Sequence, residues 1–419
     1  MRTSRLYLII ALCVMRLLQA TDPIDNAHFY RPTYFWGEPR FERTHLTSFD
    51  VSLGGGSAMT GQDSCGHCVE LFDIYGIHNM LALGKKVPKV DDAISKILDD
   101  ITKINGNNCF GTLSIGAEFK ILEAYINLYQ NLSRGFFLQV NLPIRSIKIN
   151  SIQTKFNPPN SETHALPPAW KTFLEEFDTI LSTYHLCIKP VDKTHLGDIG
   201  FITGWSRTYQ ETEYLDFIDT TFKFGLLIPT GKRKDPSNLL DIPYGYNGHV
   251  GFPFYWTSSI GLFDWITLGL HAYVIPFTKR TQQVHIKTSP DQQGIIKLAS
   301  TQAKMSSGAL WELGAYIKAD HFIGGLSMLL GYTFDKKERD TLRSITTSPF
   351  SSEMANDDIM LKGWRMHTLN VLLEYDYNQP YQRVGPRIQF FYNKVLGGKR
   401  VLNTKMLGGD FGVDVTWSY

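Results

Sequence analysis

Apolar and polar residues alternate along most of this chain with the two-residue period of β-strands. The last nine residues, 411–419, are the clearest case, because one parity holds only Phe411, Val413, Val415, Trp417 and Tyr419. The other parity holds glycine, aspartate, threonine and serine. Successive side chains of a strand point to opposite faces, so one face of this strand is apolar and the other is small or polar. A strand with lipid outside and water inside needs this pattern.

Twelve segments carry the alternation, and they predict twelve strands. They are residues 47–56, 111–128, 135–145, 197–208, 214–228, 248–257, 263–275, 309–318, 322–334, 369–376, 387–393 and 411–419. In the second segment, Leu113, Ile115, Ala117 and Phe119 are predicted to face outward. The parity there slips near Ile121, which predicts a bulge.

The connections between these segments are alternately long and short. Long connections follow the first five odd-numbered segments and short ones follow the even-numbered segments, as in bacterial barrels with long extracellular loops and short periplasmic turns. The last connection, over 397–404, is of middling length. We therefore expect an all-β, transmembrane, antiparallel β-barrel of about twelve strands in the bacterial outer membrane. Residues 282–300 leave room for one more hairpin, which would make fourteen strands.

Two long loops carry helical rather than strand periodicity. Residues 90–104 and 169–184 are both amphipathic, which predicts short helices in extracellular loops. Such helices either pack on the loops and the barrel rim, or fold inward as a plug or lie on the membrane surface. The polar stretch 351–358, which contains Asp357 and Asp358, is interpreted as a solvated loop.

The first twenty residues resemble a secretory signal peptide. Arg2 and Arg5 precede an apolar stretch, and Gln19-Ala20 suits cleavage after a small residue. We expect a signal peptide over 1–20, a periplasmic segment over 21–45, and one barrel over 46–419. The terminal aromatic strand resembles the recognition signal of outer-membrane barrels, so the expected partners are outer-membrane lipid and the barrel-assembly machinery.

Composition narrows the class of partner. The formal net charge is +2 and the basic residues are scattered, which argues against nucleic-acid binding. The mean hydropathy of −0.15 is ordinary, and a barrel with alternating faces is compatible with that value. After the signal, the sequence holds no apolar stretch near the length that a transmembrane helix requires.

Four cysteines follow the signal, and their even number in an exported chain predicts disulfides in any of three connectivities. They are Cys65, Cys68, Cys109 and Cys187. The stretch Cys65-Gly66-His67-Cys68 also suggests a redox pair or half a zinc site. No second Cys-x-x-Cys and no thioredoxin-like pattern supports those readings, so we expect no metal.

Charged residues recur on the parity that is predicted to face inward. An unpaired charge is very costly in a dry interior, so they indicate either a wet lumen or ion pairs that brace a filled one. Both signs occur, so strong ion selectivity is not indicated. The residues predicted to face the lumen are Glu118, Lys120, Arg145, Lys223, Glu312, Lys318, Glu374, Asp376, Arg387 and Asp414.

Nothing in the sequence favours catalysis. The active His-x-Ser of barrel phospholipases does not occur in this chain. We therefore expect neither a catalytic residue nor a cofactor.

Two glycine-containing stretches resemble a known family. Leu196-Gly197-Asp198-Ile199-Gly200-Phe201 is followed by Phe224-Gly225-Leu226-Leu227-Ile228-Pro229-Thr230-Gly231. A Gly-Asp-Ile strand start and a strand that ends in Pro-Thr-Gly are similar to outer-membrane channels of the phenol-degradation-pathway and long-chain fatty-acid transporter families. The resemblance implies passive diffusion of small solutes, hydrophobic ones included, across the outer membrane. The alternative is a non-transport barrel whose long loops bind a partner or a host surface.

Overall fold

The computed structural model describes residues 46–83, 111–157, 168–210, 215–263, 265–343, 351–377 and 383–416. The expected signal peptide (1–20), periplasmic segment (21–45) and helix over 90–104 lie outside these ranges, as do Cys109, Trp417 and Tyr419. Those expectations stay predictions.

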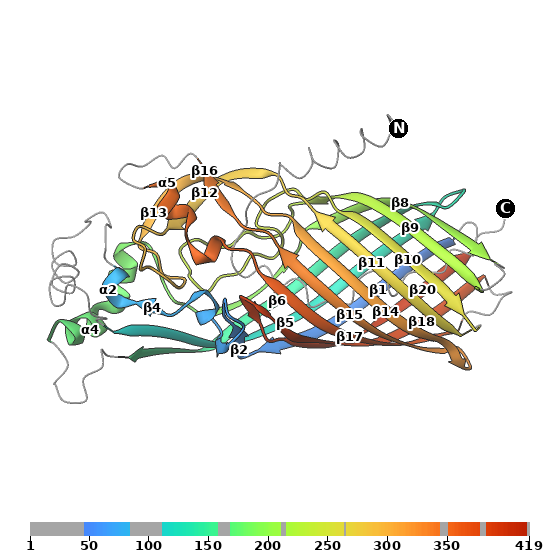
Figure 1. The fold of residues 1–419 in the computed structure, drawn as a ribbon, viewed down its shortest axis with the longest axis horizontal. Helices are drawn as coiled ribbons and strands as arrows, with labels where there is room; N and C mark the ends of the chain where they lie inside the picture. The colour runs from blue at the N-terminus through green and yellow to red at the C-terminus, as the bar shows by residue number, and fades with distance from the viewer. Residues whose placement is uncertain are drawn as a thin grey trace.

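Twelve antiparallel strands form a closed barrel, which confirms the predicted fold (Figure 1). Each strand pairs with its neighbours in the order of the chain, and β1 closes the cylinder by pairing with β20 over Leu46–Ser57 and Lys405–Thr416. The barrel strands are β1 (Leu46–Ala58), β5 (Thr112–Asn131), β6 (Phe136–Asn157), β8 (Ile199–Gln210), β9 (Phe217–Ile228), β10 (Phe254–Leu262), β11 (Ile266–Ile275), β14 (Leu310–Ile323), β15 (Leu326–Lys337), β17 (Arg365–Asp376), β18 (Val384–Lys399) and β20 (Lys405–Thr416).

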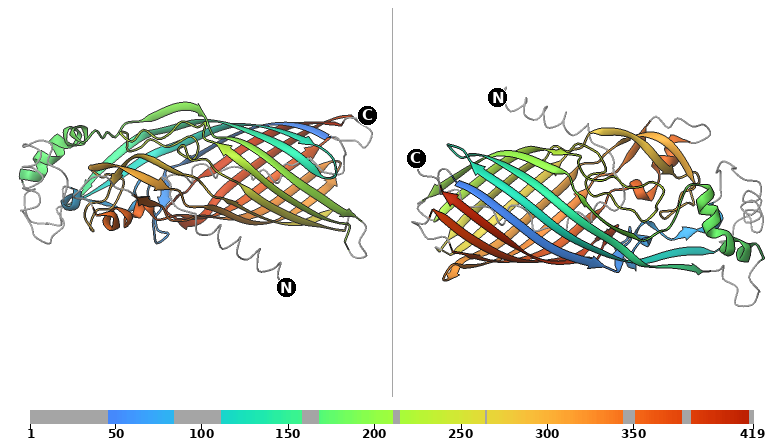
Figure 2. Two further views of the ribbon diagram at one scale, coloured as in Figure 1. Left: turned by 90° about the horizontal axis from the view of Figure 1, so that it is seen from above. Right: turned by 180° about the vertical axis from the view of Figure 1, so that it is seen from behind.

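The long connections gather at one end of the barrel and the short turns at the other (Figures 1 and 2). One short turn differs from its prediction. β14 continues past residues 319–321, where the sequence placed a turn, and the chain reverses at Gly324 and Gly325 with φ of 51° and 93°. Positive φ at both central residues is the geometry of a two-residue hairpin turn, which glycine adopts without strain.

The hairpin suspected within 282–300 exists, but it does not enter the barrel. β12 (Lys279–Ile286) pairs with β13 (Ala299–Ser306), and β13 pairs with β16 (Thr341–Arg343) in a separate three-stranded sheet. This sheet, with the short helices α5 (Ser352–Asn356) and η3 (Ile359–Leu361), forms a cap at the long-loop end (Figure 2). The barrel therefore has twelve strands rather than fourteen.

The remaining elements also belong to the long-loop end. β2 (Thr60–Gln62), β3 (Cys68–Glu70) and β19 (Val401–Leu402) make a small sheet, and η2 (Asp73–Tyr75), β4 (His78–Asn79) and α2 (Met80–Leu83) follow it. The predicted helix over 169–184 is α4 (Pro168–Thr183), which buries one stripe. That stripe consists of Phe173, Phe177, Ile180 and Leu181.

β7 (Val191–Leu196) and β8 pair with successive parts of β6 and are separated only by Gly197 and Asp198. Asp198 accepts hydrogen bonds from the backbone N–H of Gly231 at 2.8 Å and of Tyr246 at 2.6 Å. Thr230 Oγ1 donates to the Gly197 carbonyl at 2.7 Å. The Gly-Asp-Ile and Pro-Thr-Gly stretches therefore fit together at this break in the strand.

The outer face of the barrel is apolar on every strand. Each barrel strand points outward at least one apolar side chain that is 39% exposed or more. These side chains, one for each strand, are Phe49, Leu128, Leu138, Phe201, Phe224, Trp256, Leu270, Leu313, Leu330, Leu373, Phe390 and Phe411. Exposed aromatic residues also flank the short turns, as Tyr209, Phe263, Trp265, Phe322 and Tyr377. An apolar band with aromatic residues at its edge is the lipid-facing surface of an outer-membrane barrel, so the chain is located in that membrane.

No helix in the described ranges combines the length and the apolar character needed to cross a membrane.

The predicted change of parity in β5 is wrong, because its odd-numbered side chains face inward along the whole strand. What changes is the face that is apolar. Toward the short turn Leu122 and Leu128 are exposed on the outside, whereas toward the loops Phe119 and Ile115 are buried on the inside at 0% exposure. β5 therefore rises out of the hydrocarbon into a zone with water outside and a dry core inside.

Candidate functional site: a paired polar bore beneath a loop pocket

Most of the charged residues predicted to face the lumen lie on the inward parity of their strands. Buried among them are Arg145, Lys223, Glu312, Glu374, Arg387 and Asp414, each at most 5% exposed, while Lys318 and Asp376 are half-buried. Glu118 and Lys120 differ, because they alternate with the buried Phe119 and Ile121 and so point outward. There they pair with each other at 2.8 Å, and the Lys120 side chain is 50% exposed.

One ion pair spans three strands on the inside of the barrel. Arg387 of β18 donates through Nη2 to Asp50 Oδ1 of β1 at 2.5 Å. The strand between them is β20, whose Gly412 is in register with both residues. Asp50 Oδ2 also accepts from Asn127 at 3.1 Å, and Asn127 Oδ1 accepts from Gln139 at 3.0 Å, so the network continues onto β5 and β6.

A second group of pairs braces the adjoining arc of the barrel, from β11 to β18. Lys318 of β14 reaches Glu374 of β17 at 3.0 Å, across β15. Gln389 donates to the other Glu374 oxygen at 2.6 Å. His271 Nε2 and Glu312 Oε1 are 2.7 Å apart on neighbouring strands.

Arg145 joins the wall of the barrel to a loop. Its Nε donates to Glu123 at 3.1 Å, and its Nη1 donates to the backbone carbonyl of Tyr244 in the β9–β10 connection. Glu123 and Arg145 are 4% and 2% exposed. The bore is therefore filled by paired polar side chains, the second of the two interpretations that the sequence left open.

Apolar side chains fill the barrel above these pairs. Inward residues of β5 and β6, such as Ile121 and Ile147, belong to one buried cluster with Ile74 and Tyr75 from the first long loop and Leu240 from the β9–β10 connection. The loops thus fold inward over the bore and close it with a dry layer.

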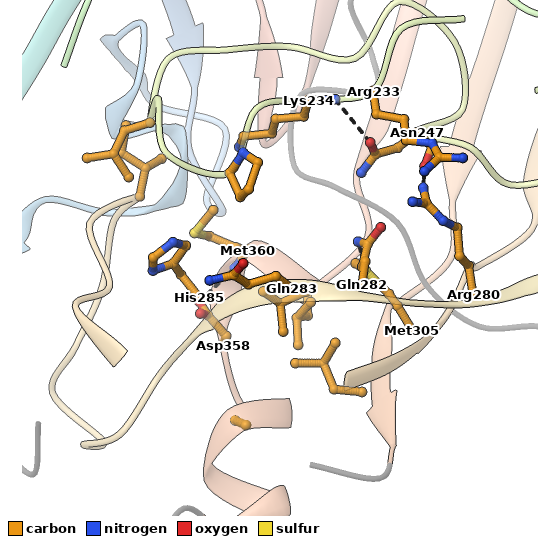
Figure 3. Close-up of a pocket in the computed structure, with 17 residues that line it drawn as sticks. Arg233, Lys234, Asn247, Arg280, Gln282, Gln283, His285, Met305, Asp358 and Met360 are labelled. Carbon is orange, nitrogen blue, oxygen red and sulfur yellow. Dashed lines mark hydrogen bonds between the residues drawn. The ribbon is translucent and has the colours of Figure 1, made fainter. Parts of the chain in front are cut away.

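A pocket of about 300 Å³ lies in the cap, between the β9–β10 connection and the β12–β13–β16 sheet (Figure 3). Its apolar wall comes from both sides of the cleft. The residues of that wall are Leu239, Val284, Ile295, Met305, Leu342, Ala355, Met360 and Leu361. The volume is at the lower end of the range for small-molecule sites, roughly 300–1,000 Å³.

Two arginines meet at one edge of this pocket. A Cβ atom on Gly248 would touch Arg280 Nη1 and lie 2.8 Å from Arg233 Nε, so both guanidinium groups lie over this glycine, whose φ is 82°. Arg280 donates to the Asn247 carbonyl at 2.6 Å (Figure 3). Burial and the neighbouring Arg233 lower the pKa of Arg280. No carboxylate in the described ranges forms an ion pair with either arginine.

The far side of the pocket is held by two lysine–aspartate pairs. Lys297 lies 3.6 Å from Asp358, and Lys287 lies 3.0 Å from Asp357. Asp358 is 3% exposed, so the interpretation of this dipeptide as solvated loop is wrong for Asp358. Asp357 remains 59% exposed in its side chain. Alternation along strands carries no signal for such contacts, which join two distant loops.

The cysteine prediction also differs from the structure. Cys65, Cys68 and Cys187 all have free thiols, and Cys109 lies outside the described ranges. Cys65 lies within a tight turn and Cys68 is the first residue of β3 after it. The turn is closed by its own backbone hydrogen bonds, from Asp63 N to His67 O at 3.0 Å and from Gly66 N to Asp63 O at 3.2 Å. A disulfide is therefore not needed to close this turn.

The structure describes part of the predicted assembly signal, from Phe411 to Val415. Phe411 is exposed on the outer face, and Gly412 and Asp414 are buried on the inner face, as the alternation predicted. Val413 and Val415 share the outward parity of Phe411. Recognition by the assembly machinery stays a prediction.

Comparisons with known proteins give matches of structure only. No protein-family model matches the chain, and no curated protein sequence matches it. An outer membrane channel from Pseudomonas putida F1 is similar at 10% identity with a TM-score of 0.48, over 91% of this chain and 98% of that one.

Two other solved structures are similar over most of their length. A Pseudomonas aeruginosa FadL homologue matches at 9% identity and a TM-score of 0.30, over 96% of this chain and 100% of that one. The Pseudomonas putida toluene transporter TodX matches at 8% identity and a TM-score of 0.31, over 96% and 97%. These proteins are of the kind that the two glycine-containing stretches predicted. At such low identity they assign no role to any residue, so the function has to follow from the geometry of this chain.

Proposed function

We propose that this chain is an outer-membrane channel for small amphiphilic solutes, which bind first in the loop pocket. The observation that carries the proposal is the pairing of an apolar wall with Arg233 and Arg280 at one edge. Two neighbouring guanidinium groups without an ion-pair partner in the described ranges repel each other, and an anion between them removes that repulsion. A solute with an apolar body and a carboxylate end matches both parts of the pocket.

Passage below the pocket requires the bore to open. The pairs that fill it, such as Arg387–Asp50 and Lys318–Glu374, are made by side chains and not by the strand ladder. Rotation of these side chains would open a polar path while the barrel hydrogen bonds stay intact. We infer passive diffusion, gated by the loops above and by the side-chain pairs below.

Binding is tested with 4-phenylbutyrate and its uncharged match 4-phenylbutanol, by calorimetry on the full chain in detergent. Arg233→Gln with Arg280→Gln should weaken phenylbutyrate binding at least tenfold, about 1.4 kcal/mol, and leave phenylbutanol binding unchanged. Lys232→Gln is the matched control, since Lys232 is exposed next to Arg233 and does not line the pocket. Equal loss in the control, or no loss in the double variant, contradicts the proposal.

Transport is tested by solute flux into proteoliposomes and by conductance in planar bilayers. Met360→Trp places a larger side chain in the pocket and should reduce phenylbutyrate flux. A correctly folded barrel, verified by its heat-dependent electrophoretic mobility, that shows neither flux nor conductance would count against a channel.

The filled bore favours one other function. If the ion pairs never open, the barrel serves as an anchor whose loops bind a partner or a host surface. Deletion of the cap loops would then abolish adhesion of cells and leave permeability unchanged.

A further inference from the structure

The turn between β2 and β3 brings three different metal-ligating groups together at the long-loop end of the barrel (Figure 1). A carboxylate oxygen of Asp63, the thiol of Cys65 and a ring nitrogen of His67 all lie within 4.8 Å of one another. Asp63 Oδ2 and His67 Nδ1 are already 3.6 Å apart. This cluster lies on the outer rim and is separate from the loop pocket and the bore.

The backbone of the turn fixes the carboxylate and leaves one of its oxygens available. Asp63 Oδ1 accepts from the backbone N–H of Cys65 at 2.7 Å and of His67 at 2.9 Å. Oδ2 therefore faces the histidine ring. Gly66 between the cysteine and the histidine has a φ of 92°, a conformation that L side chains rarely adopt, and it lets the turn present both side chains on one side.

We propose that Asp63, Cys65 and His67 bind a first-row transition metal ion, with Zn²⁺ as the best match. Zinc takes thiolate, imidazole and carboxylate ligands in a tetrahedral arrangement with bonds of about 2.0–2.3 Å. Ligand atoms in such a site are about 3.4–3.8 Å apart. The three groups need to close by about 1 Å, which rotation of the exposed Cys65 and His67 side chains supplies.

Three protein ligands leave a fourth position for water. Cys68 is not part of the group, and its sulfur lies 3.8 Å from Asn403 Nδ2, which donates to it. Binding of the metal displaces the proton of the Cys65 thiol, so the affinity for zinc should be higher at higher pH. The Asp63 carbonyl also accepts from Arg400 N at 3.1 Å, so the metal would stiffen the contact between this turn and the β18–β19 corner.

The test uses the full chain, reduced, metal-stripped and folded in detergent. Titration with Zn²⁺ against a chelating dye should give one ion per chain. Asp63→Asn, Cys65→Ser and His67→Ala should each weaken binding at least tenfold. Two matched controls, Cys187→Ser and His185→Ala, change a cysteine and an exposed histidine elsewhere and should bind as the parent does.

Cobalt provides a readout that a folding defect does not imitate. Co²⁺ should give a thiolate charge-transfer band that Cys65→Ser abolishes, while the heat-dependent mobility of the barrel stays unchanged. The proposal is overturned by reduced protein that binds no stoichiometric zinc, by zinc binding that survives Cys65→Ser, or by a Cys65–Cys68 disulfide that forms as fast with saturating zinc as without it.

Discussion

Arg387 and Asp50 form an ion pair over a strand that belongs to neither of them. β20 runs between their strands, and its Gly412 stands in register with both residues. A Cβ atom on Gly412 would touch Asp50 Oδ1 and lie 3.1 Å from Arg387 Nη2. The absence of a side chain at this one position is what allows the pair to form.

The first prediction is that Gly412→Ala destabilises the barrel, although alanine in a strand ordinarily does no harm. The added methyl group pushes Asp50 from Arg387, so we expect a loss of about 1–3 kcal/mol in the free energy of unfolding. Unfolding by denaturant in detergent measures it. Gly55→Ala is the control, because its Cβ would meet only ordinary contacts at 3.7 Å or more. Equal stability of the two variants would show that the ion pair over Gly412 is unimportant for stability.

Opening the bore should increase its conductance. The double variant Asp50→Ala and Arg387→Ala removes both members of the pair, and we expect a conductance several times that of the parent in planar bilayers. Lys148→Ala with Asp192→Ala removes a pair whose side chains are 47% and 64% exposed on the outer face, and should leave the conductance unchanged. No difference between the two double variants would mean that this pair does not obstruct the path.

The cap should loosen in mild acid because of His78. Its Nδ1 lies 3.1 Å from the Leu113 carbonyl, and its Nε2 accepts from the backbone N–H of Ile295 at 2.8 Å and of Ile296 at 3.2 Å. Burial, together with the charge of the nearby Lys297, lowers the pKa of His78 to about 4, although the hydrogen bond with the Leu113 carbonyl opposes this shift. A protonated ring would place an N–H against two N–H donors.

The lowered pKa of His78 determines how the stability of the closed cap changes with pH. Between pH 6.5 and about 4 the opened cap binds one more proton than the closed cap, so acidification through that window favours opening. The slope is up to about 1.4 kcal/mol per pH unit. Hydrogen exchange at residues 295–296, corrected for intrinsic rates, should report it. His78→Gln should lose this pH dependence, and His185→Gln, at an exposed site, should retain it.

The buried pair in the cap provides the fourth prediction. Asp358→Asn leaves Lys297 buried without its counter-charge and should destabilise the cap by about 3–5 kcal/mol. Burial lowers the pKa of Lys297, which Asp358 opposes, so the variant should regain stability as the pH rises and the lysine becomes neutral. Asp357→Asn, on the exposed neighbour, should change stability by less than about 1 kcal/mol. Proteolysis of the cap loops measures both, and similar losses would contradict this account.

The sequence predicted the wall of the barrel well because the signal for each strand, the alternation of apolar and polar residues, lies within the strand's own segment. Every second residue faces lipid, so alternation located twelve strands and both sets of connections. Alternation could not show which of the two faces of a strand contacts water at a given distance above the membrane. Above the lipid the outside of β5 meets water, and this is why Glu118 and Lys120 were assigned to the wrong side.

The cap and its pocket leave no comparable signal. Arg233 and Arg280 are 47 positions apart in the sequence, and only the folding of two loops onto each other brings them together over Gly248. The free cysteines are a further case, because a count of thiols does not reveal that backbone hydrogen bonds already close the turn between β2 and β3.

The rise of β5 and β6 beyond the hydrocarbon has a practical consequence for how this protein meets its surroundings. The alternation of long and short connections predicts that the cap lies on the extracellular side, so we expect an arriving molecule to meet the cap before it encounters any acyl chain. Proteases, antibodies and impermeant labels applied to intact cells should then reach Arg233, whereas the barrel wall shields Arg387.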